Sequence, residues 1–192
     1  MERTAVLVAS EGIFNVHHNR TGQPLQAPGA EPVAVFTTGG TLDKVYFDAL
    51  SRYEVGTPVV KGILEEAGVG VSYTVTPLMQ KDSLDLTDND RTAIRAAAEG
   101  ADARRILVTH GTDTMIETAN ALADITGKTI VLTGALKPAR FRDTDAVFNV
   151  AAAFVAIQIL PPGVWIVMNG RVFDPKRARK NRDANRFEEV KE

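Results

Sequence analysis

The sequence VAVFTTGGT, residues 33–41, joins a short apolar strand to a glycine turn that ends in a threonine. The sequence ILVTHGTDT, residues 106–114, repeats this arrangement further along the chain. Strands that are apolar on both faces are typical of a buried parallel sheet. Ligands of an open α/β sheet bind outside the carboxyl ends of its strands. We therefore expect both turns to deliver hydroxyl groups to one crevice.

Strands and helices alternate along the chain, which predicts a doubly wound, largely parallel α/β sheet flanked by helices. Strands are expected over 33–38, 69–77, 104–109, 129–133 and 164–168, and helices over 57–67, 87–100, 112–125 and from 143 or 145 to 160. Thr87 and Asp90 resemble a capping box. The pair Asn169-Gly170 is a two-residue hairpin signal. Residues 42–56 are interpreted as a long loop at the active site.

The length of the chain indicates one main domain. Its 192 residues are enough for one core. Residues 1–32 contain an apolar stretch followed by proline- and glycine-rich sequence, which predicts an N-terminal extension made of a strand plus a loop or hairpin. Residues 33–192 are then the catalytic domain.

Composition excludes several classes of function. The net charge of −2 gives no reason to expect a nucleic acid partner. The absence of cysteine excludes disulfides and cysteine metal sites. No signal peptide and no apolar run of membrane length is found, so we expect a cytoplasmic protein without a membrane partner. The adjacent His17 and His18 lack further ligands nearby and are interpreted as part of a surface loop, so no metal is expected.

The threonine turns have alternative interpretations. A phosphate-binding loop is disfavoured because neither GxGxxG nor GxxxxGK[ST] occurs. Spacing alone favours a glycine turn with incidental threonines. A threonine hydroxyl becomes a nucleophile only when a neighbouring group removes its proton. Tyr46, five residues after Thr41, is one candidate, and packing of its ring to anchor the loop is a second role compatible with the first.

Further blocks of sequence accompany the two turns. They are TGGTL at 38–42, HGTDT at 110–114, ETA at 117–119, GALKPA at 134–139 and FN at 148–149. In this combination and order, over about residues 33–182, the chain resembles the bacterial-type L-asparaginases. These are threonine amidohydrolases that convert L-asparagine to L-aspartate and ammonia. The resemblance implies the fold of their N-terminal domain and a reaction without a cofactor.

The resemblance also implies catalytic roles. Thr41 would be the nucleophile, served by Tyr46, and Thr112 would form a second triad with a lysine. Aligning the segment after the last predicted helix places Lys180 as that lysine, although the basic run 176–182 leaves a neighbouring base open.

Substrate-binding residues follow from the same resemblance. Asp113 would bind the α-ammonium group, although Thr112 and Asp113 are also suited to capping a helix. Gly40 and Gly111 would let the backbone approach the substrate. Asp82 matches an aspartate of the loop that holds the α-carboxylate. Gln80 and Lys81 depart from the serine and glutamine of that loop, so the α-carboxylate would fall to Lys81 or to backbone N–H groups.

The chain is similar to a short form of the family that lacks the C-terminal domain. We therefore expect a homodimer or higher homo-oligomer, because self-association would bury the remaining apolar surface. An alternative hypothesis is a non-catalytic amino-acid-binding module that retained the pocket but lost turnover.

Overall fold

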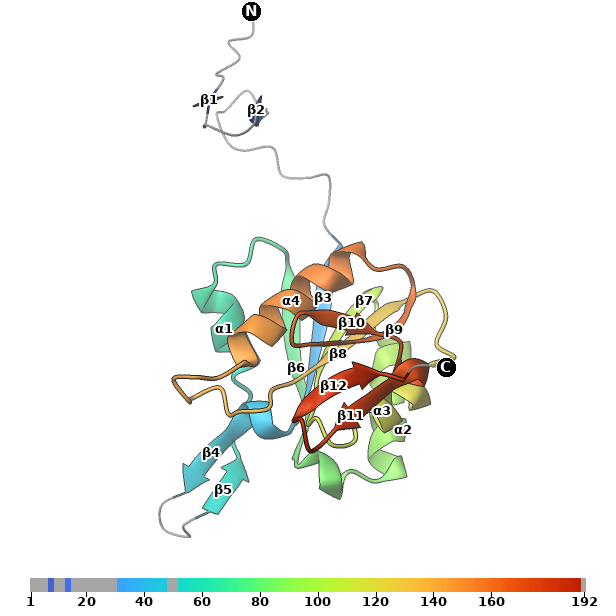
Figure 1. Ribbon diagram of the computed structural model, residues 1–192. Helices are drawn as coiled ribbons and strands as arrows, with labels where there is room; N and C mark the ends of the chain where they lie inside the picture. Colours follow the sequence, from blue (N-terminus) through green and yellow to red (C-terminus); the bar gives the residue numbers. More distant parts are fainter. Residues whose placement is uncertain (1–6, 9–12, 15–30, 48–51, 191–192) are drawn as a thin grey trace, which may run out of the picture. The chain divides into compact units, whose positions relative to one another are not determined.

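The computed structural model describes residues 7–8, 13–14, 31–47 and 52–190 (Figure 1). Contacts divide the chain into two units, Met1–Ala30 and Glu31–Glu192. In the first unit, β1 (Leu7–Val8) pairs antiparallel with β2 (Ile13–Phe14). His17 and His18 lie outside the described residues. The extent and role of the N-terminal extension stay a prediction.

The second unit is built on a six-stranded sheet in the order β10-β9-β8-β7-β3-β6. Its strands are β3 (Val33–Gly39), β6 (Tyr73–Lys81), β7 (Arg105–Thr109), β8 (Thr129–Thr133), β9 (Gly163–Met168) and β10 (Arg171–Phe173). All neighbours are parallel except β9 and β10. The predicted fold class is confirmed.

Helices cover both faces of this sheet. On one face α2 (Asp88–Gly100) and α3 (Met115–Ala121) bury Ile94, Met115 and Leu122 against one side of the strands. On the other face α1 (Val60–Glu66) and α4 (Ala146–Ile159) bury Leu64 and Ile157. In the described part of the chain, no helix combines the length and the apolar character needed to cross a membrane.

Helix starts differ from prediction where side chains have tertiary partners. The capping box of Thr87 and Asp90 at the start of α2 is confirmed. The helix α3 begins at Met115, not at Thr112, and Thr114 is its N-cap residue. The predicted cap Asp145 precedes α4, but its carboxylate accepts the N–H groups of Leu136 and Lys137 rather than capping the helix.

The interpretation of residues 42–56 as a loop is wrong. A 3₁₀ turn η1 (Thr41–Asp43) is followed by β4 (Lys44–Phe47), which pairs antiparallel with β5 (Arg52–Val55). Aromatic pairing stabilises this hairpin, since the Tyr46 and Tyr53 rings meet edge to face with centroids 5.4 Å apart. Figure 1 shows the hairpin extending away from the sheet.

Two more hairpins lie towards the C-terminus. The predicted turn at Asn169 and Gly170 is confirmed, and both residues have the positive φ that a tight hairpin turn requires (51° and 75°). After the turns η3 (Ser83–Asp85) and η4 (Pro175–Arg177), the chain forms β11 (Ala178–Asn181) and β12 (Arg186–Glu189). This last hairpin, which was not predicted, carries Lys180.

The contact between two glycine turns gives a test of the fold. A Cβ atom at Gly40 would lie 2.4 Å from the Gly111 backbone, and Gly40 has a φ of 86°. We expect Gly40→Ala to lower the free energy of unfolding by about 2–5 kcal/mol, through clash and backbone strain. The control Gly62→Ala, in open space on α1, should instead gain roughly 0.5–1 kcal/mol of helix stability. Denaturant unfolding measures both, and equal stability of the two variants would contradict the contact.

Candidate active site

The two threonine turns meet at the point where the order of strands reverses. From β3 the chain passes to β6 on one side of it and then crosses to β7 on the other side. Such switch points form the ligand crevice of open α/β sheets. The Thr38 hydroxyl donates to the Thr109 carbonyl over 3.0 Å, and Gly40 lies against Gly111. The predicted juxtaposition of the two turns is therefore confirmed.

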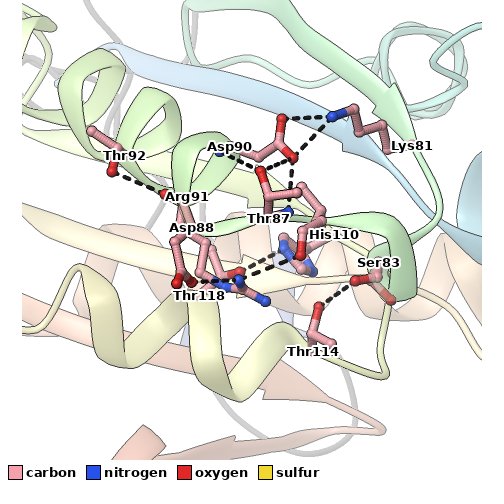
Figure 2. Close-up of polar contacts among 11 residues, drawn as sticks. Lys81, Ser83, Thr87, Asp88, Asp90, Arg91, Thr92, His110, Thr114 and Thr118 are labelled. Carbon is pink, nitrogen blue, oxygen red and sulfur yellow. Dashed lines mark hydrogen bonds and ion pairs between the residues drawn. The ribbon is translucent and has the colours of Figure 1, made fainter.

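His110 holds the second turn from within the core. Its Nδ1 lies 2.7 Å from the Gly111 carbonyl and its Nε2 lies 2.8 Å from the Thr118 hydroxyl (Figure 2). Since a carbonyl only accepts, Nδ1 carries the proton and Nε2 accepts from Thr118. Burial lowers the pKa of His110 to about 4, against the Gly111 hydrogen bond, and the charge of Arg91 adds to the effect. A neutral imidazole thus orders the turn.

Lys180 reaches this second turn from the β11–β12 hairpin. Its Nζ atom lies 2.8 Å from the Thr112 hydroxyl and 2.8 Å from Asp113 Oδ1. The Thr112 residue is buried and the Lys180 side chain is 13% exposed. The Nε atom of Arg182 is 3.8 Å from the same Asp113 oxygen. The structure therefore brings together three residues that the sequence singled out.

The first turn places Thr41 at the start of η1, half-buried, directly after Gly40. The Gly40 N–H donates to the Lys81 carbonyl over 2.9 Å, which joins this turn to the end of β6. Tyr46 is on β4 and is 53% exposed. Among the described residues its ring contacts Tyr53, and no hydrogen bond joins it to Thr41.

Lys81 and Asp82 have partners outside the two turns. Lys81 Nζ bonds both carboxylate oxygens of Asp90, at 2.8 and 2.9 Å (Figure 2). Asp82 pairs with Lys44 over 2.6 Å and accepts the Leu84 N–H. Lys81 is therefore engaged by another group in this structure, which weakens its candidacy as the partner of a substrate carboxylate.

Two contributors near the site were missed from the sequence. Ser83 is buried, and its side chain fills the space that a Cβ at Gly111 would need. The Thr114 hydroxyl donates to the Ser83 carbonyl over 2.7 Å (Figure 2). Asp43 is 1% exposed and follows Thr41 by two residues. The signal available for Asp43 is an acidic residue directly after the apolar Leu42 within the strand-forming run LDKVYF.

The described residues contain no group of three or more His, Asp or Glu side chains placed to hold a metal ion. What they do contain is a hydroxyl, an ammonium and a carboxylate in mutual contact, beside a second turn with its own hydroxyl. Fold and site together define an open α/β domain with a polar threonine site at its switch point.

Comparison with known proteins agrees with this description. Residues 32–191 match the family model described as Asparaginase, N-terminal. The chain therefore belongs to the asparaginase family, and the resemblance seen in its sequence is confirmed.

Individual relatives carry two kinds of name. A glutamyl-tRNA(Gln) amidotransferase polypeptide of Methanosarcina barkeri is 30% identical over 171 residues, which are 82% of this chain and 39% of that protein. L-asparaginase I of Vibrio cholerae superimposes with a TM-score of 0.71 at 25% identity, over 84% of this chain and 52% of that one. The thermostable L-asparaginase of Thermococcus kodakarensis has a TM-score of 0.69 at 24% identity, over 83% and 51%. The chain thus spans about half of these solved structures and less of the curated relative.

Proposed function

We propose that this chain is an amidohydrolase that converts L-asparagine to L-aspartate and ammonia, with Thr41 as the nucleophile. The observation that carries the proposal is the contact of Lys180 with Thr112 and Asp113 beside the Thr41 turn. A lysine from a distant hairpin holds a buried threonine hydroxyl, an arrangement suited to moving protons at a reacting centre.

The reaction runs in two halves. The Thr41 hydroxyl loses its proton to Tyr46 and attacks the amide carbon, and backbone N–H groups near Thr112 polarise the carbonyl oxygen. The amide nitrogen takes up a proton and leaves as ammonia, which leaves an ester on Thr41. Thr112 and Lys180 then assist a water molecule that hydrolyses this ester and frees aspartate. No cofactor enters these steps.

The substrate needs partners for both of its backbone charges. The Asp113 carboxylate binds the α-ammonium group in a charge-assisted contact, on the side left open by Lys180. Gly40 and Gly111 let the substrate approach the backbone closely. Because Lys81 is bound to Asp90, backbone N–H groups of the two turns are the better candidates for the α-carboxylate.

A second candidate is hydrolysis of glutamine. The amidotransferase name of the relatives favours it, since transfer of an amide nitrogen begins with cleavage of an amide. Glutamine is one methylene longer than asparagine, which is worth roughly 1–3 kcal/mol of discrimination in a fitted site. The ratio of kcat/KM for the two amino acids distinguishes the candidates.

The catalytic threonines and the lysine are tested by substitution. We expect Thr41→Ala to abolish ammonia release, and Thr112→Val or Lys180→Met to lower kcat by on the order of 10²–10⁴-fold, because each removes a proton-transfer step. Lys176→Met, in the exposed part of the same basic run, is the matched control and should retain wild-type kcat.

Two outcomes contradict the proposal. Wild-type ammonia release by Thr41→Ala excludes that nucleophile. Binding of asparagine by the unaltered chain without any release of ammonia supports a non-catalytic binding module instead.

The hydroxyl of Tyr46 is tested separately from its ring. Tyr46→Phe keeps the packing against Tyr53 and should lower kcat by on the order of 10²-fold while changing KM little, because only the proton-transferring group is lost. Tyr53→Phe removes the hydroxyl of the facing residue and should leave kcat unchanged. Steady-state kinetics on asparagine decide, and a Tyr46→Phe enzyme close to wild type would show that Tyr46 acts by packing alone.

Self-association is proposed from the outer face of α4. Val147, Phe148, Val155 and Ile159 are 52–77% exposed on a helix that has few polar residues on any side. A helix that is apolar all round is normally buried. A second copy packed on this face would form a closed dimer.

The α4 face is tested by solution mass. We expect light scattering to give at least twice the chain mass of 20.7 kDa, and Ile159→Lys to return the mass to that of one chain, because a charge in an apolar interface is costly. Val172→Lys, at an exposed apolar residue on β10, should leave the dimer intact. A wild-type monomer would rule this interface out.

A further inference from the structure

Asp43 sits at the base of the β4–β5 hairpin and makes two separate contacts there. Its backbone carbonyl accepts the Gly56 N–H over 2.8 Å. Its Oδ1 atom accepts the Val59 N–H over 2.9 Å, just before α1 begins. The residue therefore ties the two ends of the hairpin to each other and to the start of a helix.

The same residue closes the turn that starts with Thr41. η1 spans three residues, with Thr41 first and Asp43 last. Tyr46 follows on β4. A displacement of the Asp43 carboxyl group would move the turn of the proposed nucleophile and the strand of its proposed base together.

The carboxyl group is only half satisfied. Asp43 is 1% exposed, and its Oδ2 atom is buried with no hydrogen-bond partner. Burial raises the pKa of Asp43 to about 6, against the Val59 hydrogen bond. At neutral pH the closed hairpin thus holds a buried charge with one unpaired oxygen, which is costly.

Charged neighbours do not relieve this cost. The charged groups on the surrounding segments are Lys44 and Glu54 on the hairpin, Lys61, Glu65 and Glu66 on α1, Asp82 after β6, and Lys137, Arg140, Arg142, Asp143 and Asp145 before α4. Lys44 pairs with Asp82, Lys61 with Glu65, and Lys137 with Asp143. Within the described part of the chain no ion pair reaches Asp43.

We propose that Asp43 is a positioning residue for the proposed amide hydrolysis, whose carboxyl group fixes the base of the β4–β5 hairpin so that Thr41 and Tyr46 stay in register. The inference rests on the proposed function for its effect on catalysis. Its effect on the hairpin is independent of that function. Loss of the proton from Asp43 favours opening of the hairpin base, because the charge is better solvated when the base is open.

The sign and size of the pH effect follow from linkage. The pKa of Asp43 is about 6 in the closed state and near the ordinary 3.8 when the residue is exposed. The closed state therefore loses stability as the pH rises through this window. Protection of the Gly56 and Val59 amides against hydrogen exchange, corrected for the intrinsic rate, should fall about tenfold between pH 5 and pH 7.5.

Substitutions separate positioning from mere packing. Asp43→Asn keeps an acceptor for Val59 but cannot ionise, so protection of both amides should become independent of pH and kcat should stay within a few-fold of wild type. Asp43→Ala has no acceptor, so protection should fall at every pH and kcat should drop on the order of 10²-fold with a smaller change in KM, as expected for a misplaced catalytic group. Asp102→Asn, at an exposed carboxylate before β7, is the control and should change neither quantity.

The outcomes are decided by amide-resolved exchange together with kinetics. A flat pH dependence of Gly56 and Val59 protection in the wild-type chain, or the same slope in Asp43→Asn, overturns the inference. Equal losses of kcat by Asp43→Asn and Asp43→Ala also overturn it. If the wild-type chain releases no ammonia, the proposed function fails, and the exchange measurement alone decides the role of Asp43 at the hairpin base.

Discussion

The close approach of two backbones, at Gly40 and Gly111, is the constraint on which the rest of the site depends. Parallel pairing of β3 with β7 brings the two turns to one edge of the sheet, but only residues without a Cβ let them touch. The same contact continues outward, since the space beside Gly111 is filled by the Ser83 side chain. Three segments far apart in the sequence are therefore locked at one point, and the hydroxyl groups of the site inherit their positions from it.

Charge around the site is arranged by exposure. Lys180 and Asp113 lie at the rim and partly compensate one another, which leaves the carboxylate accessible to a substrate ammonium. His110 lies deeper and is kept neutral by burial. Its role is thus to hold the turn through fixed hydrogen bonds, whereas proton transfer falls to groups nearer the solvent.

Two buried titratable groups respond to pH in opposite directions. The pKa of His110 falls from 6.5 to about 4 on folding, so the unfolded chain binds a proton first and stability is lost as the pH falls through that range. The pKa of Asp43 rises to about 6, so stability is lost as the pH rises. The two effects offset each other in the global free energy of unfolding, and only local measurements resolve them.

The sequence by itself determined the alternation of strands and helices, the parallel sheet and the family, because apolar runs and glycine–threonine turns are local signals. It also placed the capping box at Thr87 and the turn at Asn169. Only the tertiary structure decided that residues 42–56 form a hairpin, because alternation there is weak and cross-strand aromatic pairs supply the stability. It likewise decided that Lys180 reaches Thr112 across 68 positions and that Asp43 is buried beside Val59. Such contacts depend on long-range packing and carry no local pattern.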